Sequence, residues 1–346
     1  MSIALDIGKF SIKLVELEKV NESIKVINLK TINIIEDLDT YDLDKLSKSQ
    51  ISASIQDLTN NLNIKIKKVK NLITSLPGSD VDTRQVSILD MPDNELLQAL
   101  ELEAKKHVPL DGTEAIIDYH HIGKDVHELD KINLLLTTTT KNKIKDHADI
   151  LKNAGFKPGI FDSDPIALCN LLQFSYELPE TGANVILDIG HSSTTLVVFG
   201  NNITYFSREI EIAGNQISKS LIRSNKITYS EAENKKHEKG IAIFEKANVE
   251  SEQAISVEQR TVLNDLVDEV RKTLRFYMKN NSQAFFNQFY LSGGCSKMIG
   301  LDSFIAEALN VKVDILNPLN KINYDKTIDN PGEFSVVIGL ALRGLF

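Results

Sequence analysis

The sequence predicts an α/β fold of two pseudo-repeated halves with a small α+β insertion between them. The tetrapeptide Leu5-Asp6-Ile7-Gly8 recurs as Leu187-Asp188-Ile189-Gly190, and each copy lies at the end of an apolar run. Elsewhere, apolar residues recur with a period of two in some segments and near 3.6 in others, which indicates alternating strands and helices. At 346 residues the chain is long enough for two such halves.

Each tetrapeptide is expected to end the first strand of a hairpin. Residues 2–7 and 12–18 form the first predicted pair of strands, with a turn at residues 8–10, and residues 184–190 and 194–207 repeat this plan. A P-loop or a Rossmann fingerprint would place a helix directly after its glycines, and the chain has no G-x-x-x-x-G-K or G-x-G-x-x-G motif. The two repeats therefore predict two β-hairpins with similar turns.

The insertion has its own pattern of strands and one helix. Strands are predicted over residues 69–76, 82–89, 115–122 and 131–140, and a helix over 94–106 after Pro92. Further helices are predicted over 143–155, 215–223, 230–239, 259–279, 302–309 and 335–342, with a strand over 288–291 and a mobile polar stretch over 238–256. The predicted division is residues 1–69 and 141–182 for the first half, 70–140 for the insertion, and 183–346 for the second half, with 215–258 as its smaller subdomain.

Composition excludes several classes of protein. The net charge of -9 and the pI near 5.4 argue against nucleic acid as the main partner, because binding to a phosphate backbone requires a basic surface. Lysines alternate with apolar residues over 64–70, which favours the outer face of a strand over an anion site. Cys169 and Cys295 have no C-x-x-C spacing, and no segment reaches the ~18 apolar residues of a membrane span, so a reduced, cytoplasmic protein is expected.

The two predicted turns are expected to hold a phosphate group and a magnesium ion. Gly8 and Gly190 have no Cβ, so backbone N–H groups can approach phosphate oxygens; tight turns alone are the alternative explanation. Asp6 and Asp188 at the strand ends can hold Mg²⁺ through its waters. Hydroxyl residues follow each turn and can donate hydrogen bonds to phosphate oxygens: Ser11 after the first, and Ser192, Ser193, Thr194 and Thr195 after the second. Lys13 is a candidate phosphate contact or an ordinary surface lysine.

A third turn, at Gly293-Gly294, is the candidate adenosine site. A glycine turn that opens toward a helix presents free N–H groups, so Gly293, Gly294 and Ser296 are expected to contact the nucleoside. Gly214 would bring backbone close to phosphate or ribose. On the long predicted helix, Arg271 and Lys272 are either charges that flank the base or solvated surface residues.

This order of motifs resembles the actin/Hsp70/sugar-kinase superfamily, and within it the chain most resembles the PilM family of type IV pilus assembly proteins. His191 and Ala213 differ from the family pattern, which has a small residue and a glycine there. The residues that carry the closer resemblance are 12–17 after the first turn; Pro92, Glu95, Leu96, Ala99, Glu103, 108–110, Asp118 and Tyr119 in the insertion; Arg208, 213–215, 231–233 and 271–277 in the second half; and 339–344 at the end.

The resemblance implies an actin-like (ribonuclease H-like) fold that binds ATP or ADP with Mg²⁺ between its halves. Glu233 and Lys236 match an A-E-x-x-K pattern that lies at ribose and adenine in related proteins, with a solvated helix face as the alternative. The implied partners are the N-terminal cytoplasmic peptide of PilN and other inner-membrane pilus assembly proteins, with membrane association only through them. The expected peptide groove, for each residue of which core packing is the alternative, comprises Leu76, Val81, Val86, Ile88, Val108 and Leu110.

Hydrolysis is expected to be slow. Asp164 is the nearest candidate for a residue that orients the attacking water, and its side chain is shorter than the Glu or Gln usual for that task. The alternative functions are a filament-forming protein like FtsA or MreB and the equivalent component of a type II secretion system. A small-molecule kinase is the least favoured, because it needs a catalytic base and a substrate pocket.

Overall fold

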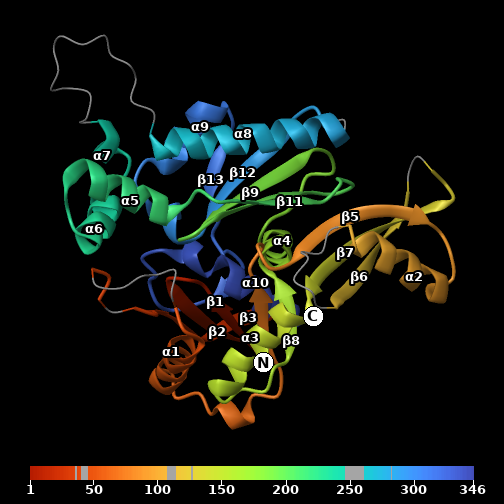
Figure 1. Cartoon of the computed structure of the whole chain (residues 1–346), viewed down its shortest axis with the longest axis horizontal. Coiled ribbons are helices and arrows are strands. Elements are labelled where there is room, and N and C mark those ends of the chain that lie inside the picture. The colour runs from red at the N-terminus through yellow and green to blue at the C-terminus, as the bar shows by residue number, and fades with distance from the viewer. Residues whose placement is uncertain (36, 40–45, 107–113, 126–127, 246–260, 282) are drawn as a thin grey trace.

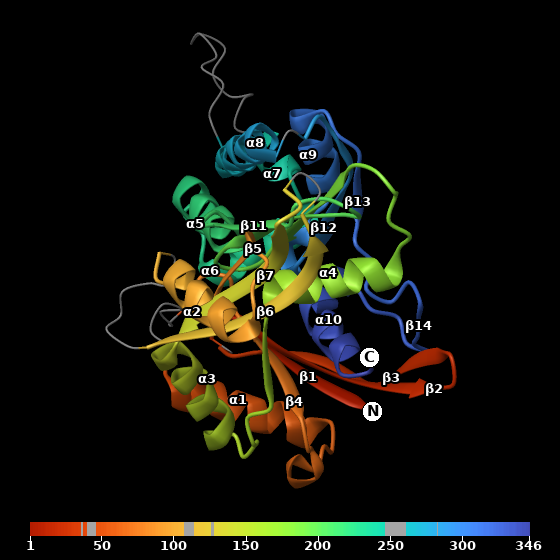
Figure 2. The same cartoon turned by 90° about the vertical axis from the view of Figure 1, so that its right-hand side faces the viewer.

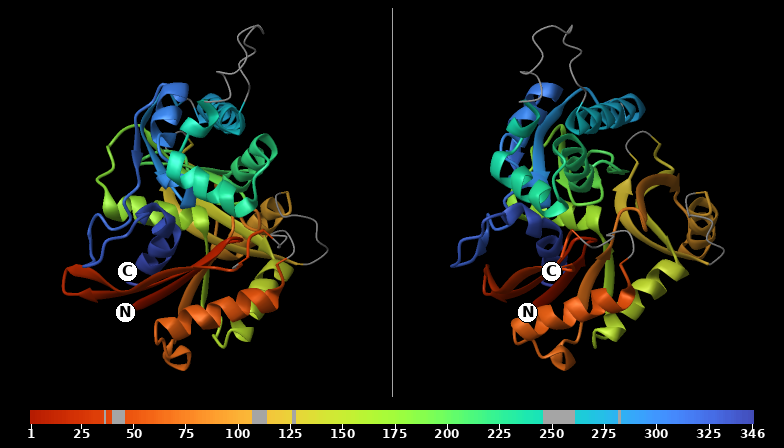
Figure 3. Two further views of the ribbon diagram at one scale, coloured as in Figure 1. Left: turned by 90° about the vertical axis from the view of Figure 1, so that its left-hand side faces the viewer. Right: turned by 60° about the vertical axis from the view of Figure 1, so that its left-hand side comes forward.

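Three sheets organise the chain in the computed structural model, which describes residues 1–35, 37–39, 46–106, 114–125, 128–245, 261–281 and 283–346 (Figure 1). A six-stranded sheet has the order β14-β3-β2-β1-β4-β8, and a five-stranded sheet has the order β11-β10-β9-β12-β13. A three-stranded sheet, β5-β7-β6, lies to one side of the two larger sheets with helix α2 (Figure 3).

The six-stranded sheet has helices on both faces. Because successive side chains of a strand point to opposite faces, Leu5 and Leu14 pack with α1 and α3, whereas Ala4 and Val15 pack with α4 and α10. The elements are β1 (Ser2–Ile7), β2 (Ser11–Val20), β3 (Ser23–Asn33), β4 (Leu72–Leu76), β8 (Ile160–Ser163), β14 (Ile322–Asn323), α1 (Lys48–Asn61), α3 (Lys141–Asn153), α4 (Asp164–Ser175) and α10 (Ser335–Arg343).

The five-stranded sheet shares α4 and α10 with the first. Ile186 and Val197 join the same buried cluster as those helices, and the opposite face, with Val185 and Leu196, packs on α5, α8 and α9. Figure 2 shows α4 and α10 between the two larger sheets. The elements are β9 (Ala183–Ile189), β10 (Thr194–Phe199), β11 (Phe206–Ile210), β12 (Phe286–Ser292), β13 (Val313–Ile315), α5 (Gly214–Asn225), α6 (Tyr229–Lys239), α7 (Ala242–Glu245), α8 (Val262–Asn281) and α9 (Leu301–Leu309).

The three-stranded sheet has a small core of its own. Leu96 and Leu100 on α2 (Asp93–Ala104) pack against Leu134 and Leu136 on β7 (Lys131–Thr140), which lies between β5 (Asp82–Leu89) and β6 (Ala115–Lys124). Strand β5 also contacts the five-stranded sheet, since Ser207 Oγ on β11 donates to Thr83 O at 3.3 Å and Tyr205 N–H, just before β11, donates to Gln85 Oε1 at 2.9 Å. The insertion is therefore tied to the second half through the edge of β11.

Several expectations about individual elements are corrected by the structure. Strand β4 belongs to the six-stranded sheet and not to the insertion, because it pairs parallel with β1; β14 and α10, from the end of the chain, also pack there. The single strand expected over 194–207 is two strands, β10 and β11. The stretch expected as a lysine-rich strand contains a 3₁₀ helix (Ile66–Lys68). Residues 246–256 of the polar stretch expected over 238–256 lie outside the described residues, and α7 falls within its earlier part.

Among the described helices, none is long and apolar enough to cross a membrane.

Candidate nucleotide-binding site

The two tetrapeptide repeats form hairpins with the same turn geometry. Gly8 N–H donates to Ser11 O at 3.1 Å, and Gly190 N–H donates to Ser193 O, also at 3.1 Å. A Cβ on Gly8 would lie 2.9 Å from the Ser11 carbonyl oxygen, and one on Gly190 would lie 3.1 Å from that of Ser193. The absence of a side chain is therefore what allows both turns to close this tightly.

Both hairpins line a cleft of about 1100 Å³. The structure thus brings together residues that are separated by most of the length of the chain, from both hairpins, α5, α6 and the third turn. The predicted site residues that line the cleft are Asp6, Gly8, Ser11, Lys13, Asp164, Asp188, Gly190, Ser192, Ser193, Gly214, Glu233, Lys236 and Gly294.

At the first hairpin, Lys13 forms an ion pair with Asp6. The Nζ–Oδ2 distance is 3.0 Å, and each side chain is 13% exposed. Burial alone would lower the pKa of Lys13, but the charge of Asp6 and the hydrogen bond to it outweigh burial, so the pKa is raised. Lys13 is therefore a fixed positive charge at the cleft floor.

The carboxyl groups around this lysine are crowded. Burial, together with the charges of Asp6 and Glu209, raises the pKa of Asp188 to about 6. Burial and the charge of Asp6 raise the pKa of Asp164 well above its usual range. Burial therefore favours the neutral form of the Asp164 carboxyl group.

This donor set fits a hydrated divalent cation better than one bound directly by protein. The described residues contain no cluster of three or more His, Cys, Asp or Glu that could hold a metal ion. Among the carboxyl groups that line the cleft, Asp6 and Asp188 lie at the ends of the two repeated strands, and Oδ1 of Asp164 is buried without a hydrogen-bond partner. Magnesium usually keeps several waters and takes one or two carboxylates plus phosphate oxygens, so these residues suit it.

At the second hairpin, the hydroxyl groups are held by a carboxylate that the sequence did not indicate. Glu209 accepts hydrogen bonds from Ser193 Oγ and from Thr195 Oγ1, the latter at 3.0 Å. The start of α5 closes against the same turn, because Gly214 N–H donates to Gly190 O at 3.1 Å and Asn215 N–H donates to His191 O at 2.7 Å.

Glu233 and Lys236 form a buried ion pair on α6. The Nζ–Oε2 distance is 2.6 Å, Lys236 also donates to Ser218 Oγ at 3.0 Å, and Ser218 donates to Glu233. Burial alone would raise the pKa of Glu233, but the Lys236 charge and these hydrogen bonds lower it. The pair therefore joins α5 to α6 at the cleft wall and is not the solvated helix face that was the alternative.

The Gly293-Gly294 turn leads into a 3₁₀ helix (Gly294–Lys297). Gly293 has φ +85°, and a Cβ there would lie 2.5 Å from Ile189 O, so only glycine fits beside β9. Ser296 is buried; its hydroxyl donates to Gly293 O at 2.7 Å and supports the turn without lining the cleft.

Besides Gly293 and Ser296, three predicted nucleotide contacts are absent from the cleft lining. Arg271 pairs with Asp268 at 2.5 Å and donates to Ala308 O, and Lys272 pairs with Glu269 at 2.6 Å, so both face other parts of α8 and α9. Both charges thus form ion pairs with acidic residues three positions earlier on the same helix. Thr194 is fully buried, and its hydroxyl donates to Ile212 O at 2.7 Å.

The apolar residues expected to line a peptide groove are mostly buried in the structure. Leu76 is 3% exposed and Val81 is 8% exposed. Val86 and Ile88 are partly buried against the core of the insertion, which leaves part of each available on the edge strand β5. Val108 and Leu110 lie outside the described residues.

Sequence reasoning missed several residues of the cleft besides Glu209. The Phe10 ring stacks on His191 with centroids 4.8 Å apart, so the tips of the two hairpins touch. Lys297 and Asp329 pair at 2.6 Å, and Asn330 donates to Gly294 O at 3.1 Å. No sequence pattern near these residues indicates a site, because they meet only in the folded chain.

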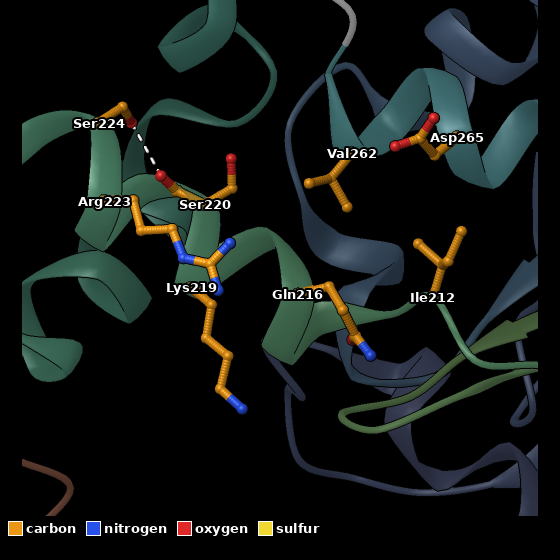
Figure 4. Close-up of a pocket in the computed structure, with 8 residues that line it drawn as sticks. All are labelled: Ile212, Gln216, Lys219, Ser220, Arg223, Ser224, Val262 and Asp265. Atoms are coloured by element: carbon orange, nitrogen blue, oxygen red, sulfur yellow. Dashed lines mark hydrogen bonds between the residues drawn. The ribbon is translucent and has the colours of Figure 1, made fainter.

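A second, smaller hollow of about 500 Å³ lies between α5 and the start of α8 (Figure 4). It shares Gln216 and Lys219 with the cleft, and none of the predicted site residues lines it. The lining residues are Ile212, Gln216, Lys219, Ser220, Arg223, Ser224, Val262 and Asp265.

Two sheets that share a layer of helices, with matched hairpins facing one cleft, define an actin-like fold. Over 100% of this chain and 98% of the other, the structure matches the solved PilM-PilN type IV pilus biogenesis complex with a TM-score of 0.80 and 23% identity. It also matches ethanolamine utilization protein EutJ from Carboxydothermus hydrogenoformans, with a TM-score of 0.53 and 14% identity over 99% of this chain and 89% of that one.

The sequence comparisons give the family. The family model of the type IV pilus assembly protein PilM matches residues 4–345. Cell division protein FtsA of Staphylococcus epidermidis (strain ATCC 12228 / FDA PCI 1200) is 21% identical over 362 aligned residues, which cover 91% of this chain and 74% of that protein. The chain belongs to the PilM family of type IV pilus assembly proteins, as its motifs indicated.

Proposed function

We propose that this chain is a cytoplasmic, nucleotide-binding scaffold of a type IV pilus assembly machine. It binds Mg-ATP, or Mg-ADP, between its halves and the N-terminal cytoplasmic peptide of PilN beside its insertion. The observation that carries the nucleotide part is the cleft in which Asp6, Lys13 and Asp188 meet between two matched hairpins. Membrane association occurs through PilN and other inner-membrane assembly proteins.

Each wall of the cleft has a role in this proposal. Lys13 supplies a positive charge, and the hairpin hydroxyls and Gly8 and Gly190 supply neutral donors for phosphate oxygens. Asp6 and Asp188 hold the waters of Mg²⁺, which neutralises phosphate charge when it is bound. Glu233, Lys236 and the turn at Gly294 form the nucleoside end of the cleft.

Turnover is proposed to be slow. Asp164 is the nearest candidate for a water-orienting residue, and its side chain is shorter than the Glu or Gln usual for that task. A bound nucleotide then acts mainly as a stabilising ligand that spans the halves.

The test is thermal unfolding with and without Mg-ATP. Nucleotide at about 100 times its dissociation constant should stabilise the protein by roughly 2.7 kcal/mol and raise the midpoint. Asp6→Ala and Asp188→Ala should each remove most of that shift, whereas Glu269→Ala on α8, outside the cleft, should keep it. An unchanged wild-type midpoint at millimolar nucleotide would contradict the proposal.

The peptide part of the proposal rests on β5. Its pairing partner in the sheet is β7. The part of β5 around Thr83 and Gln85 contacts β11, whereas Val86 and Ile88 beyond it are only partly buried, so the proposed peptide pairs along this second part of the edge. Ile88→Glu should weaken binding of a synthetic PilN N-terminal peptide at least roughly tenfold by fluorescence polarisation, because it places a charge in an apolar contact. Leu129→Glu, at a side chain 87% exposed, is the matched control. Equal affinities of the two variants would place the peptide elsewhere.

The similarity to FtsA supports a second candidate, a filament-forming protein. Sedimentation of the purified chain with and without Mg-ATP separates the two, because only a filament pellets with nucleotide.

A further inference from the structure

Within the described residues, the Glu209 carboxylate is held at the second hairpin by two hydroxyl groups. It is half-buried and accepts hydrogen bonds from Ser193 Oγ and Thr195 Oγ1. Among the ion pairs of the described residues, none includes Glu209, although lysines line the same cleft. This carboxylate therefore has no cationic partner where the structure describes the chain.

The turn after β4 confines the carboxylate from the other side. A Cβ on Gly78 would lie 2.5 Å from Glu209 Oε2, so the absence of a side chain at Gly78 makes room for the carboxylate. Asp6 and Asp188, which line the same cleft, add like charge nearby. Glu209 thus stands between the hairpin and the start of the insertion, in an already acidic place.

A hydroxyl group has one hydrogen to donate. Ser193 and Thr195 cannot give that hydrogen to Glu209 and to a phosphate oxygen at once. A phosphate at this hairpin would also lie beside the negative charge of Glu209, which repels it.

We propose that Glu209 is an internal anion that occupies the phosphate-binding hydroxyls of the second hairpin and that a nucleotide phosphate must displace. The inference rests on the proposed nucleotide function and adds a residue that sets its affinity. The two anions compete for the same donors, so Glu209 lowers the affinity for nucleotide.

The proposal predicts that mutation of Glu209 increases the affinity for nucleotide. Mutation of a structural residue or of a residue that holds the ligand would not increase it. Losing a structural contact, or a residue that holds the ligand, weakens binding. Removing an internal competitor strengthens it, because a hydrogen bond to a charged group contributes enough to change affinity by roughly tenfold or more.

The experiment is calorimetric titration of Mg-ATP into wild type, Glu209→Gln and Glu209→Ala, with Glu238→Gln on the exposed face of α6 as a charge-matched control. Both Glu209 variants should bind roughly tenfold more tightly than wild type, with Glu209→Ala at least as tight because it leaves no acceptor. The control should match wild type. Circular dichroism melting of each variant verifies that the protein titrated is folded.

A second experiment tests whether Glu209 acts through the hydroxyl groups of the hairpin. In a Ser193→Ala/Thr195→Val background both hydroxyl donors to Glu209 are gone, so Glu209→Gln should then change the affinity by less than about threefold. A full tenfold gain in that background would show that Glu209 acts through overall charge and would overturn the inference.

The outcomes separate this inference from the proposed function. Unchanged or weaker binding by folded Glu209 variants, with wild type binding normally, overturns the inference alone. Binding by Glu209→Ala when wild type does not bind supports both. Failure of wild type and both variants to bind Mg-ATP overturns both.

Discussion

The two hairpins share a sequence and a turn but differ in charge. Seven residues after each aspartate, and opposite it in register, the first hairpin has Lys13 and the second has Thr195. Lys13 pairs with Asp6, whereas Thr195 donates to Glu209 and leaves Asp188 without a lysine in register. Similar backbones therefore carry one turn with an Asp–Lys ion pair and one turn with two carboxyl groups and no lysine in register.

The difference shows what a repeated motif does and does not specify. The Gly8 and Gly190 turns close identically because local sterics decide them. The charge at each turn depends on which strand lies alongside, and β10 pairs with β11, which supplies Glu209, while β2 pairs with β3. The repeat thus predicts the shape of a phosphate site but not its electrostatics.

The largest expected effect comes from the lysine. Lys13→Met removes one partner of an ion pair that is 13% exposed on each side and leaves Asp6 uncompensated, which should cost about 3 kcal/mol of unfolding free energy. Thr195→Val at the equivalent position removes one hydrogen bond to Glu209, which keeps Ser193, and should cost about 1 kcal/mol. Urea unfolding without nucleotide measures both; equal losses would erase the proposed contrast between the hairpins.

The next effect is the pH dependence of magnesium binding at the second hairpin. The pKa of Asp188 is raised to about 6, so the carboxylate that Mg²⁺ needs is lost as pH falls through that value. Affinity for Mg²⁺ with ADP should fall roughly tenfold per pH unit below about 6. The raised pKa of Lys13 lies far above this range, so the first hairpin keeps its charge throughout.

In the protein without ligand, the contribution of Asp188 to the free energy of unfolding changes with pH in the opposite direction to the affinity for Mg²⁺. An acid whose folded pKa is raised contributes stability that is fully present below its ordinary pKa and is lost as pH rises through about 6. Asp188→Asn should therefore abolish the pH-dependent magnesium binding, measured by calorimetry, and leave the unliganded protein at least as stable at neutral pH. A less stable Asn variant would show that Asp188 is charged and well compensated in the fold.

The smallest expected effect is at the point where the hairpins touch. Phe10→Ala removes the stack on His191, which spans the two halves, and should cost about 1 kcal/mol in urea unfolding. His191→Ala and the double variant complete a mutant cycle. A coupling energy near zero would mean that the rings lie together without stabilising each other.

The sequence determined the local elements of this protein. The repeated tetrapeptide predicted both hairpins, and period-two and period-3.6 patterns predicted β5, α2 and α10 close to their observed bounds. Asp6, Lys13, Asp188, Glu233 and Gly294 were all placed at one cleft by their motifs, and the structure brings them together. These features depend on backbone sterics and on side-chain period, which neighbouring residues suffice to define.

Tertiary structure decided what each element faces. Arg271 and Lys272 carry charges suited to a nucleotide, yet their positions on α8 turn them toward Asp268 and Glu269. Glu209 has no local signal, and only the pairing of β11 with β10 brings it to the hydroxyls of Ser193 and Thr195. The physical reason is that strand register and sheet packing are set by contacts between residues far apart in the chain, which no local pattern encodes.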